Sequence, residues 1–304
     1  MNKLPTETRV RVLTMLVEGS SMRSISRVCD VSINTVDKLL CDASAICADF
    51  HDKNVRGVKA AQVQTDEIWS FCYAKKRNVA KAKAAPEGAG DVWTFTGIDG
   101  DSKLLISWLV GSRDGETAFS FMDDLSSRID GRMQLTTDGF AGYRDAVGGA
   151  FGSDHVDYGQ LVKVYESSPE GQRRYSPARF VTASKTDVFG NPNRKKISTS
   201  YVERQILTMR MSMRRFTRLT NAFSKRFENH CHALALYFFW YNWVRQHKAH
   251  KLSPAMAAGL ADGLLDMAQV VQMIDAREEE QKRAAIRAKF EAEMASRRNL
   301  IGVE

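Results

Sequence analysis

Three acidic side chains stand at the ends or edges of predicted strands and helices, where a metal ion could be held. Asp66 lies in the first predicted strand, Asp138 ends a later strand, and Glu203 lies in the first turn of a helix, with 71 and 64 residues between them. Ligands of α/β sheets gather where strands end, so these distant residues could meet. Carboxylate oxygens are hard ligands that suit Mg²⁺ or Mn²⁺.

Each acid also has a simple structural interpretation. Asp66 could be a strand-edge charge, with Glu67 on the opposite face as an alternative ligand. Asp138-Gly139 is an ordinary turn pair. Ser200 and Glu203 have the spacing of a capping box, in which Glu203 would accept a backbone N–H at the helix start.

A strongly basic block surrounds Glu203. Residues 172–227 carry 14 basic side chains against two acidic ones, a net charge of +12 within a chain of net charge +8. Helical periodicity over Ser198–Phe227 places Glu203, Arg210 and Arg214 on one face. A second arc, roughly 60° or more away, contains Ile206, Met209, Met213 and Phe216 and should pack on a core.

Arginines interleaved with apolar residues favour a polyanionic partner over a merely solvated face. The arginines that we expect to contact DNA are Arg204, Arg210, Arg214, Arg215 and Arg218. Together with the three acids they fit phosphodiester chemistry, in which two divalent ions bracket the phosphate. One ion activates water or a 3′-hydroxyl, and the other stabilises the leaving oxygen.

Residues 1–50 predict a helix-turn-helix domain. A short helix at Ser21–Val28, a turn, and a third helix capped by Ser32 and running to about Cys47 have the required spacing. Ile33, Val36 and Leu40 should face inward, leaving side chains for a DNA groove at Ser32, Asn34, Thr35 and Lys38. A small helical bundle that binds no DNA is the alternative, which the zero net charge of this segment supports.

The remaining chain predicts an α/β domain over residues 62–250, after a linker at 51–61. Strands at 62–73, 91–97 and 103–110, a helix at 116–129, a strand at 133–137 and a helix at 140–150 imply a mixed sheet with helices on its faces. Val156–Tyr165 should be the last strand, followed by a basic insertion at about 167–198. An apolar helix over Asn229–Gln246 should pack across the sheet.

Residues 251–304 predict a C-terminal helical tail. Its charged helix, Ala276–Arg298, has a narrow apolar stripe of Ile286, Phe290 and Met294, which should pack on the body or on a partner subunit. The five cysteines form no CxxC pair, and the longest apolar run, Ala233–Trp240, is too short to span a bilayer. We therefore expect a cytoplasmic, nucleoid-associated protein with reduced thiols.

Three blocks of the sequence resemble the signatures of IS1-like bacterial insertion-sequence transposases. They are QTDEIWSFCYAKKRNVA, QLTTDGFAGY and STSYVERQILTMRMSMRRFTRLTNAFSKR. The resemblance implies an RNase H-like catalytic core of the DDE group, with Asp66, Asp138 and Glu203 as the metal-binding triad and Mg²⁺, or Mn²⁺, as cofactor. It also implies Ser32–Cys47 as a recognition helix.

The function that this resemblance implies is transposition. The protein would bind the terminal inverted repeats of double-stranded DNA, cleave DNA strands and join the 3′ ends to target DNA, as a homodimer or larger assembly. Two alternatives stay open. One is a DNA-binding regulator, or a domesticated transposase, that lacks catalysis. The other is a structure-selective RNase H-like nuclease.

Overall fold

The computed structural model describes residues 3–152, 154–166, 180–217, 220–248 and 250–301. The α-helices are α1 (Thr6–Val17), α2 (Met22–Cys29), α3 (Ile33–Asn54), α4 (Lys76–Val79), α5 (Gly115–Arg128), α6 (Gly142–Phe151), α7 (Ser200–Ser212), α8 (Phe227–Phe239), α9 (Pro254–Ala257) and α10 (Met267–Ile301). The strands are β1 (Gln62–Cys72), β2 (Gly90–Asp99), β3 (Leu105–Gly111), β4 (Met133–Thr137), β5 (Val156–Tyr165) and β6 (Phe180–Phe189).

The strands form one six-stranded sheet in the order β3-β2-β1-β4-β5-β6. β1, β2 and β3 are antiparallel neighbours, β4 and β5 run parallel to β1, and β6 returns antiparallel to β5. This order confirms the predicted mixed sheet of an RNase H-like α/β fold. The parallel pairs require helical crossovers, which α5 and α6 supply.

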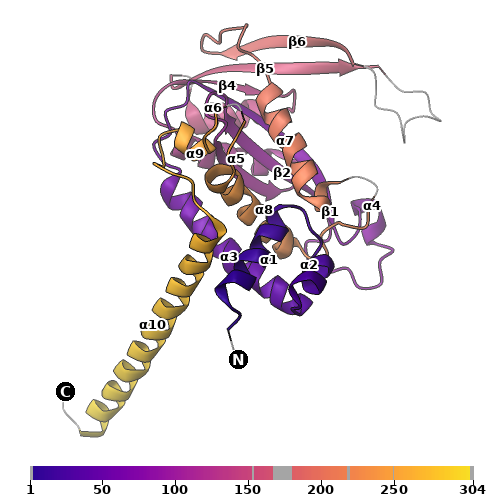
Figure 1. Ribbon diagram of the computed structural model, residues 1–304. Coiled ribbons are helices and arrows are strands. Elements are labelled where there is room, and N and C mark those ends of the chain that lie inside the picture. The colour runs from indigo at the N-terminus through magenta and orange to yellow at the C-terminus, as the bar shows by residue number, and fades with distance from the viewer. Residues whose placement is uncertain (1–2, 153, 167–179, 218–219, 249, 302–304) are drawn as a thin grey trace.

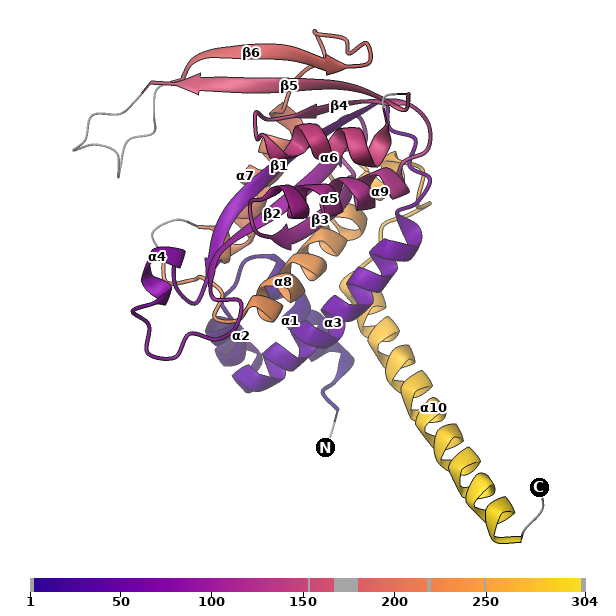
Figure 2. The ribbon, with the colours of Figure 1, turned by 180° about the vertical axis from the view of Figure 1, so that it is seen from behind.

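Helices cover both faces of the sheet (Figures 1 and 2). On one face the rings of Phe95 and Tyr143 meet edge to face, and Gly97 lies against Leu125 of α5. On the other face, α7 and α8 pack on the sheet. Asn242, which is fully buried, donates to the carbonyl of Leu105 and accepts from its N–H, at 2.8 and 2.9 Å.

The N-terminal helices share their core with the sheet domain. Ser32 caps α3 by accepting from the N–H of Thr35 at 3.1 Å, as predicted. The expected end of this helix near Cys47 is wrong, since α3 continues to Asn54. This extension places buried His51 beside the sheet, where its ring nitrogen lies 2.9 Å from the Ile106 carbonyl. Ile33, expected to face inward, is 41% exposed because it is the first residue of the helix.

Two further boundaries differ from the sequence prediction. The segment interpreted as an insertion contains β6, so β5 is not the last strand; residues 167–179 lie outside the described residues. The apolar helix ends at Phe239, and a π-helical turn follows over Trp240–Val244. Pairing with β5 creates β6, and such a contact leaves little trace in a local sequence pattern.

The last helix, α10, projects from the body (Figure 1). Its first turns are tied to α1, where Arg9 donates to Asp275 at 2.5 and 2.9 Å. The expected packing of Ile286, Phe290 and Met294 on the body is wrong, since these side chains are 70%, 62% and 39% exposed. Their packing on a partner subunit, the other alternative, stays a prediction. Among the described residues, none of the helices is both long and apolar enough to cross a membrane.

Candidate metal and DNA site

The pairing register of β1 brings Asp66 level with Asp138. β4 runs parallel to β1 and pairs with it only at Gln62–Gln64, where Gln64 is level with Thr136. Asp138 follows the end of β4, two residues after Thr136, just as Asp66 lies two residues after Gln64. After Gln64, none of the described strands pairs with this edge of β1, and the next pairing there is the bridge between Cys72 and Ser224. The end of a short parallel strand therefore creates a notch beside Asp66.

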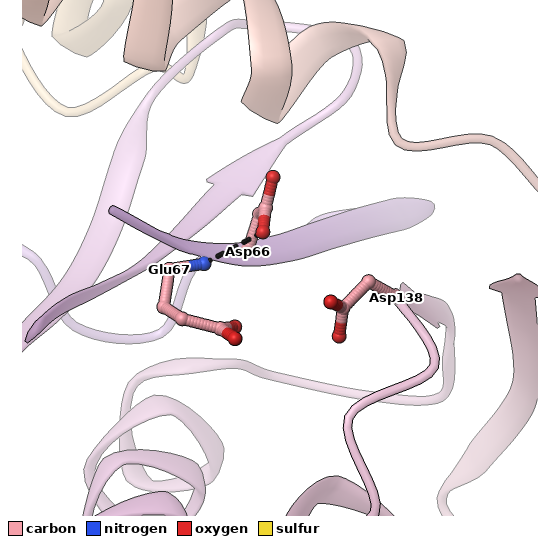
Figure 3. Close-up of side chains that lie close together, drawn as sticks. All are labelled: Asp66, Glu67 and Asp138. Carbon is pink, nitrogen blue, oxygen red and sulfur yellow. Dashed lines mark hydrogen bonds between the residues drawn. The ribbon is translucent and has the colours of Figure 1, made fainter. Parts of the chain in front are cut away.

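Three carboxylates converge in this notch (Figure 3). Asp66, Glu67 and Asp138 each place one oxygen within 4.8 Å of the others. Asp66 and Glu67 leave β1 on opposite faces, and the Asp138 carboxylate points toward both of them (Figure 3). Asp66 Oδ1 also accepts from the backbone N–H of Glu67 at 2.8 Å. Asp138 Oδ1 accepts from the N–H of Phe140 at 2.9 Å, which closes the turn after β4.

Burial and mutual repulsion raise the pKa values of these carboxyls above their ordinary range. Burial, together with the charges of Glu67 and Asp138, raises the pKa of Asp66 to about 7. Burial and the Asp138 charge also raise the pKa of Glu67, and burial raises that of Asp138. A divalent cation would relieve this repulsion, and carboxylate oxygens are the ligands that Mg²⁺ and Mn²⁺ prefer. The donor set thus fits such an ion.

Glu203 lines the same pocket from the start of α7, although it lies outside the cluster of three close carboxylates. The alternative of a capping box is wrong, because the N-cap residue is Thr199 and not Ser200. The N–H groups of Tyr201 and Val202 instead donate to Gln64 Oε1 of β1, at 2.7 and 3.2 Å. Since Gln64 caps the helix, the Glu203 carboxylate faces the pocket and accepts from the hydroxyl of Thr199.

Two cations of the pocket hold the acids in this structure, and neither was predicted from the sequence. Arg113 donates to Glu67 at 2.5 Å and lies 3.6 Å from an Asp138 oxygen. Lys163 of β5 donates to Glu203. Buried Tyr143 also donates to Glu67, at 2.9 Å. These basic residues stand alone in acidic or apolar surroundings of the sequence, so no local pattern indicated them.

The predicted DNA-binding arginines separate in space. Arg210 is exposed and lines the acid pocket, and Arg204 is exposed on α7. Because α7 ends at Ser212 and a 3₁₀ turn follows, Arg214 leaves the face of Glu203 and lines a different pocket, beside the N-terminal helices. Arg215 donates to Ser224 Oγ and the Asn229 carbonyl, at 3.0 and 2.8 Å, so its guanidinium makes contacts within the protein. Arg218 lies outside the described residues.

The predicted groove-contacting residues of α3 divide in the same way. Ser32 and Asn34 are exposed at the helix start. Thr35 and Lys38 line a pocket with Ile274 and Glu278 of α10, and Lys38 is paired with Asp42. The last helix therefore lies beside part of the predicted recognition surface.

No protein-family model matches the sequence, and no curated protein matches it either. The solved structures to which this chain shows similarity include complexes of DNA transposases. One is the piggyBac transposase synaptic complex with hairpin DNA, with a TM-score of 0.39 and 11% identity over 88% of this chain and 69% of that chain. The Mos1 strand transfer complex has a TM-score of 0.23 and 13% identity over 52% of this chain and 59% of that chain. A Mos1 mariner paired-end complex with Mn has a TM-score of 0.19 and 12% identity over 49% and 59%. The chain thus spans less than two thirds of the length of the Mos1 chains.

Proposed function

We propose that this protein is a DDE transposase of the IS1-like group, which binds the ends of an insertion sequence, cleaves DNA strands and joins them to target DNA. One observation carries the proposal. Asp66, Asp138 and Glu203, which are far apart in the sequence, line one pocket whose wall also contains Arg210. Acids and a guanidinium side by side suit a metal ion and a phosphate backbone.

In this proposal Asp66 and Asp138 would hold the ions, and Glu203 would complete the second site. Bound Mg²⁺ or Mn²⁺ would activate a water or the 3′-hydroxyl of the DNA and stabilise the leaving oxygen. Arg113 and Lys163 balance the acids until DNA arrives, since each now bonds a carboxylate. Glu67 keeps its contacts with Arg113 and Tyr143 and acts as the alternative ligand. Arg210 and Arg204 bind DNA phosphates, and Ser32 and Asn34 contact a DNA groove.

The test uses double-stranded DNA that carries the inverted repeats flanking the gene, with Mg²⁺. Asp66→Asn and Asp138→Asn should each abolish cleavage and strand transfer while DNA binding stays nearly intact. Asp123→Asn, an exposed aspartate of α5, is the matched control and should keep full activity. Cleavage retained by either site variant would remove that carboxylate from the mechanism.

The same assay separates the other two functions. Cleavage of DNA without repeats, and without joined products, would identify a structure-selective nuclease. Specific binding of the repeats without any metal-dependent nick would identify a DNA-binding regulator. Joined products that depend on the repeats, formed by paired ends, would support the transposase and its assembly into a dimer or larger complex.

A further inference from the structure

An aromatic cluster lies on the open edge of β1, beyond the acids. Trp69 and Phe71 lie on the same face of the strand as Glu67, and the ring centroids of Trp69 and Phe71 are 5.7 Å apart. Phe223, which belongs to the segment paired with the end of β1, lies 4.7 Å from Phe71 with the rings inclined by 32°. All three rings are half-exposed, unlike Phe95 of the neighbouring strand, which is fully buried against α5 and α6.

Cations are held against these rings. Lys75 Nζ lies 5.4 Å from the Trp69 ring centroid and 5.9 Å from that of Phe71. Lys225 Nζ lies 3.4 Å from the Phe223 ring centroid. A core packs aromatic rings on aliphatic groups, whereas half-exposed rings with ammonium groups beside them offer flat apolar faces and positive charge together. Nucleic-acid bases joined by phosphates have the complementary chemistry.

The cluster is continuous with the acid pocket. Trp69, Phe71, Phe223 and Lys75 line a second cavity, and Arg210 lines both this cavity and the pocket of Asp66, Asp138 and Glu203. Glu67, which belongs to the carboxylate cluster, shares the face of the rings, and at the usual rise of a strand Trp69 and Phe71 lie about 7 and 13 Å from it along β1. A DNA strand with one phosphate at the acids would therefore bring its next few bases to the rings.

We propose that Trp69, Phe71 and Phe223 form a stacking platform for an unpaired nucleobase of the DNA strand that enters the acid pocket. This inference rests on the proposed function for the position of that strand. A base inside a duplex has both faces covered by its neighbours, so only a base removed from the stack can lie on the rings. Lys75 and Lys225 contact the flanking phosphates. Every base has a flat face, so the platform holds a position without reading its sequence.

The experiment measures binding of the full-length protein to short single-stranded DNA that contains 2-aminopurine, in EDTA so that no cleavage occurs. Stacking on the rings should quench 2-aminopurine fluorescence. Trp69→Leu and Phe223→Leu should each weaken single-strand binding roughly tenfold and remove the quenching. Trp69→Phe should retain both, because an aromatic face remains. Affinity for fully paired DNA should stay unchanged in these variants.

Two controls make the result specific. Phe290→Leu removes an exposed ring on the projecting helix and should change neither affinity nor quenching. Lys225→Gln, at an exposed position, should weaken single-strand binding even if a ring variant loses stability. Unchanged affinity and quenching in Trp69→Leu and Lys225→Gln would overturn the platform, as would failure of the unaltered protein to bind single strands.

Failure of the platform and failure of the proposed function are distinguishable. Metal-dependent cleavage with normal single-strand binding by the ring variants would remove only the platform. Single-strand binding that depends on Trp69, without any metal-dependent cleavage, would support the platform and remove the transposase.

Discussion

Replacing Asp66 with asparagine should stabilise the metal-free protein while abolishing its activity. The pKa of this carboxyl rises from 3.8 to about 7 on folding, through burial and the charges of Glu67 and Asp138. A carboxyl with a raised pKa destabilises the fold above its unfolded pKa, and the cost grows until the folded pKa is passed. Each pH unit corresponds to about 1.4 kcal/mol, so the cost approaches about 4 kcal/mol near pH 8.

Asparagine keeps the acceptor oxygen that bonds the N–H of Glu67, but it removes the charge. After relaxation of the site we expect a gain of about 2 to 4 kcal/mol at pH 8, or about 4 to 8 °C in melting temperature for a chain of this size. The gain should shrink as the pH falls and become small near pH 4, close to the unfolded pKa of 3.8, below which the carboxyl is protonated in both states.

The assay is thermal unfolding in EDTA at pH 8, 6 and 4, with Asp123→Asn as an exposed control. Adding Mg²⁺ or Mn²⁺ at pH 8 should then raise the melting temperature of the unaltered protein and have little effect on Asp66→Asn, because ligands stabilise the state that binds them. A variant less stable than the unaltered protein at pH 8, or a gain independent of pH, would refute this reasoning, since it would mean that Asp66 is ionised and well paired in the folded protein.

Three other predictions follow from named contacts. Gln64→Leu should lower the free energy of unfolding by about 2 to 4 kcal/mol, because it leaves the part-buried N–H of Tyr201 and the buried N–H of Val202 without their acceptor. Gln64→Glu should retain most of the stability, and equal denaturant midpoints for the two variants would contradict the cap. Arg210→Gln should reduce the salt dependence of DNA binding by about one phosphate contact. Arg215→Gln should instead lower the melting temperature, because Arg215 donates hydrogen bonds to Ser224 and Asn229. A normal melting temperature for Arg215→Gln would show that those bonds contribute little to stability. Burial, with a nearby arginine, lowers the pKa of His51 and of His230 from 6.5 to about 3, so both rings stay neutral in the folded protein at pH 5 while the unfolded chain protonates them. Stability should therefore fall as the pH drops below 6.5. In the Asp66→Asn background, which removes the opposing effect of that carboxyl, urea unfolding at pH 5 should show a loss of about 2 kcal/mol per histidine, and an unchanged midpoint would mean that the rings are solvated.

The sequence by itself determined the local elements. β4 and β5 begin and end where their apolar patterns predict, since a strand buried on the sheet needs a run of apolar and β-branched side chains. The arc of Ile206, Met209, Met213 and Phe216 is buried as predicted, even though α7 ends before Phe216. Such patterns indicate which side chains face the core, because that depends on the spacing of apolar residues along a short segment.

Only the tertiary structure decided what the polar side chains do. Glu203 has the spacing of a capping residue, but Gln64, over 130 residues earlier in the chain, caps the helix and leaves Glu203 in the pocket. Arg210 and Arg215 look alike in the sequence, yet one lines the acid pocket and the other bonds within the protein. Arg113 and Lys163 meet the acids through the sheet register. Each partner is chosen by strand pairing and helix packing between distant segments, and the pattern of neighbouring residues does not encode those contacts.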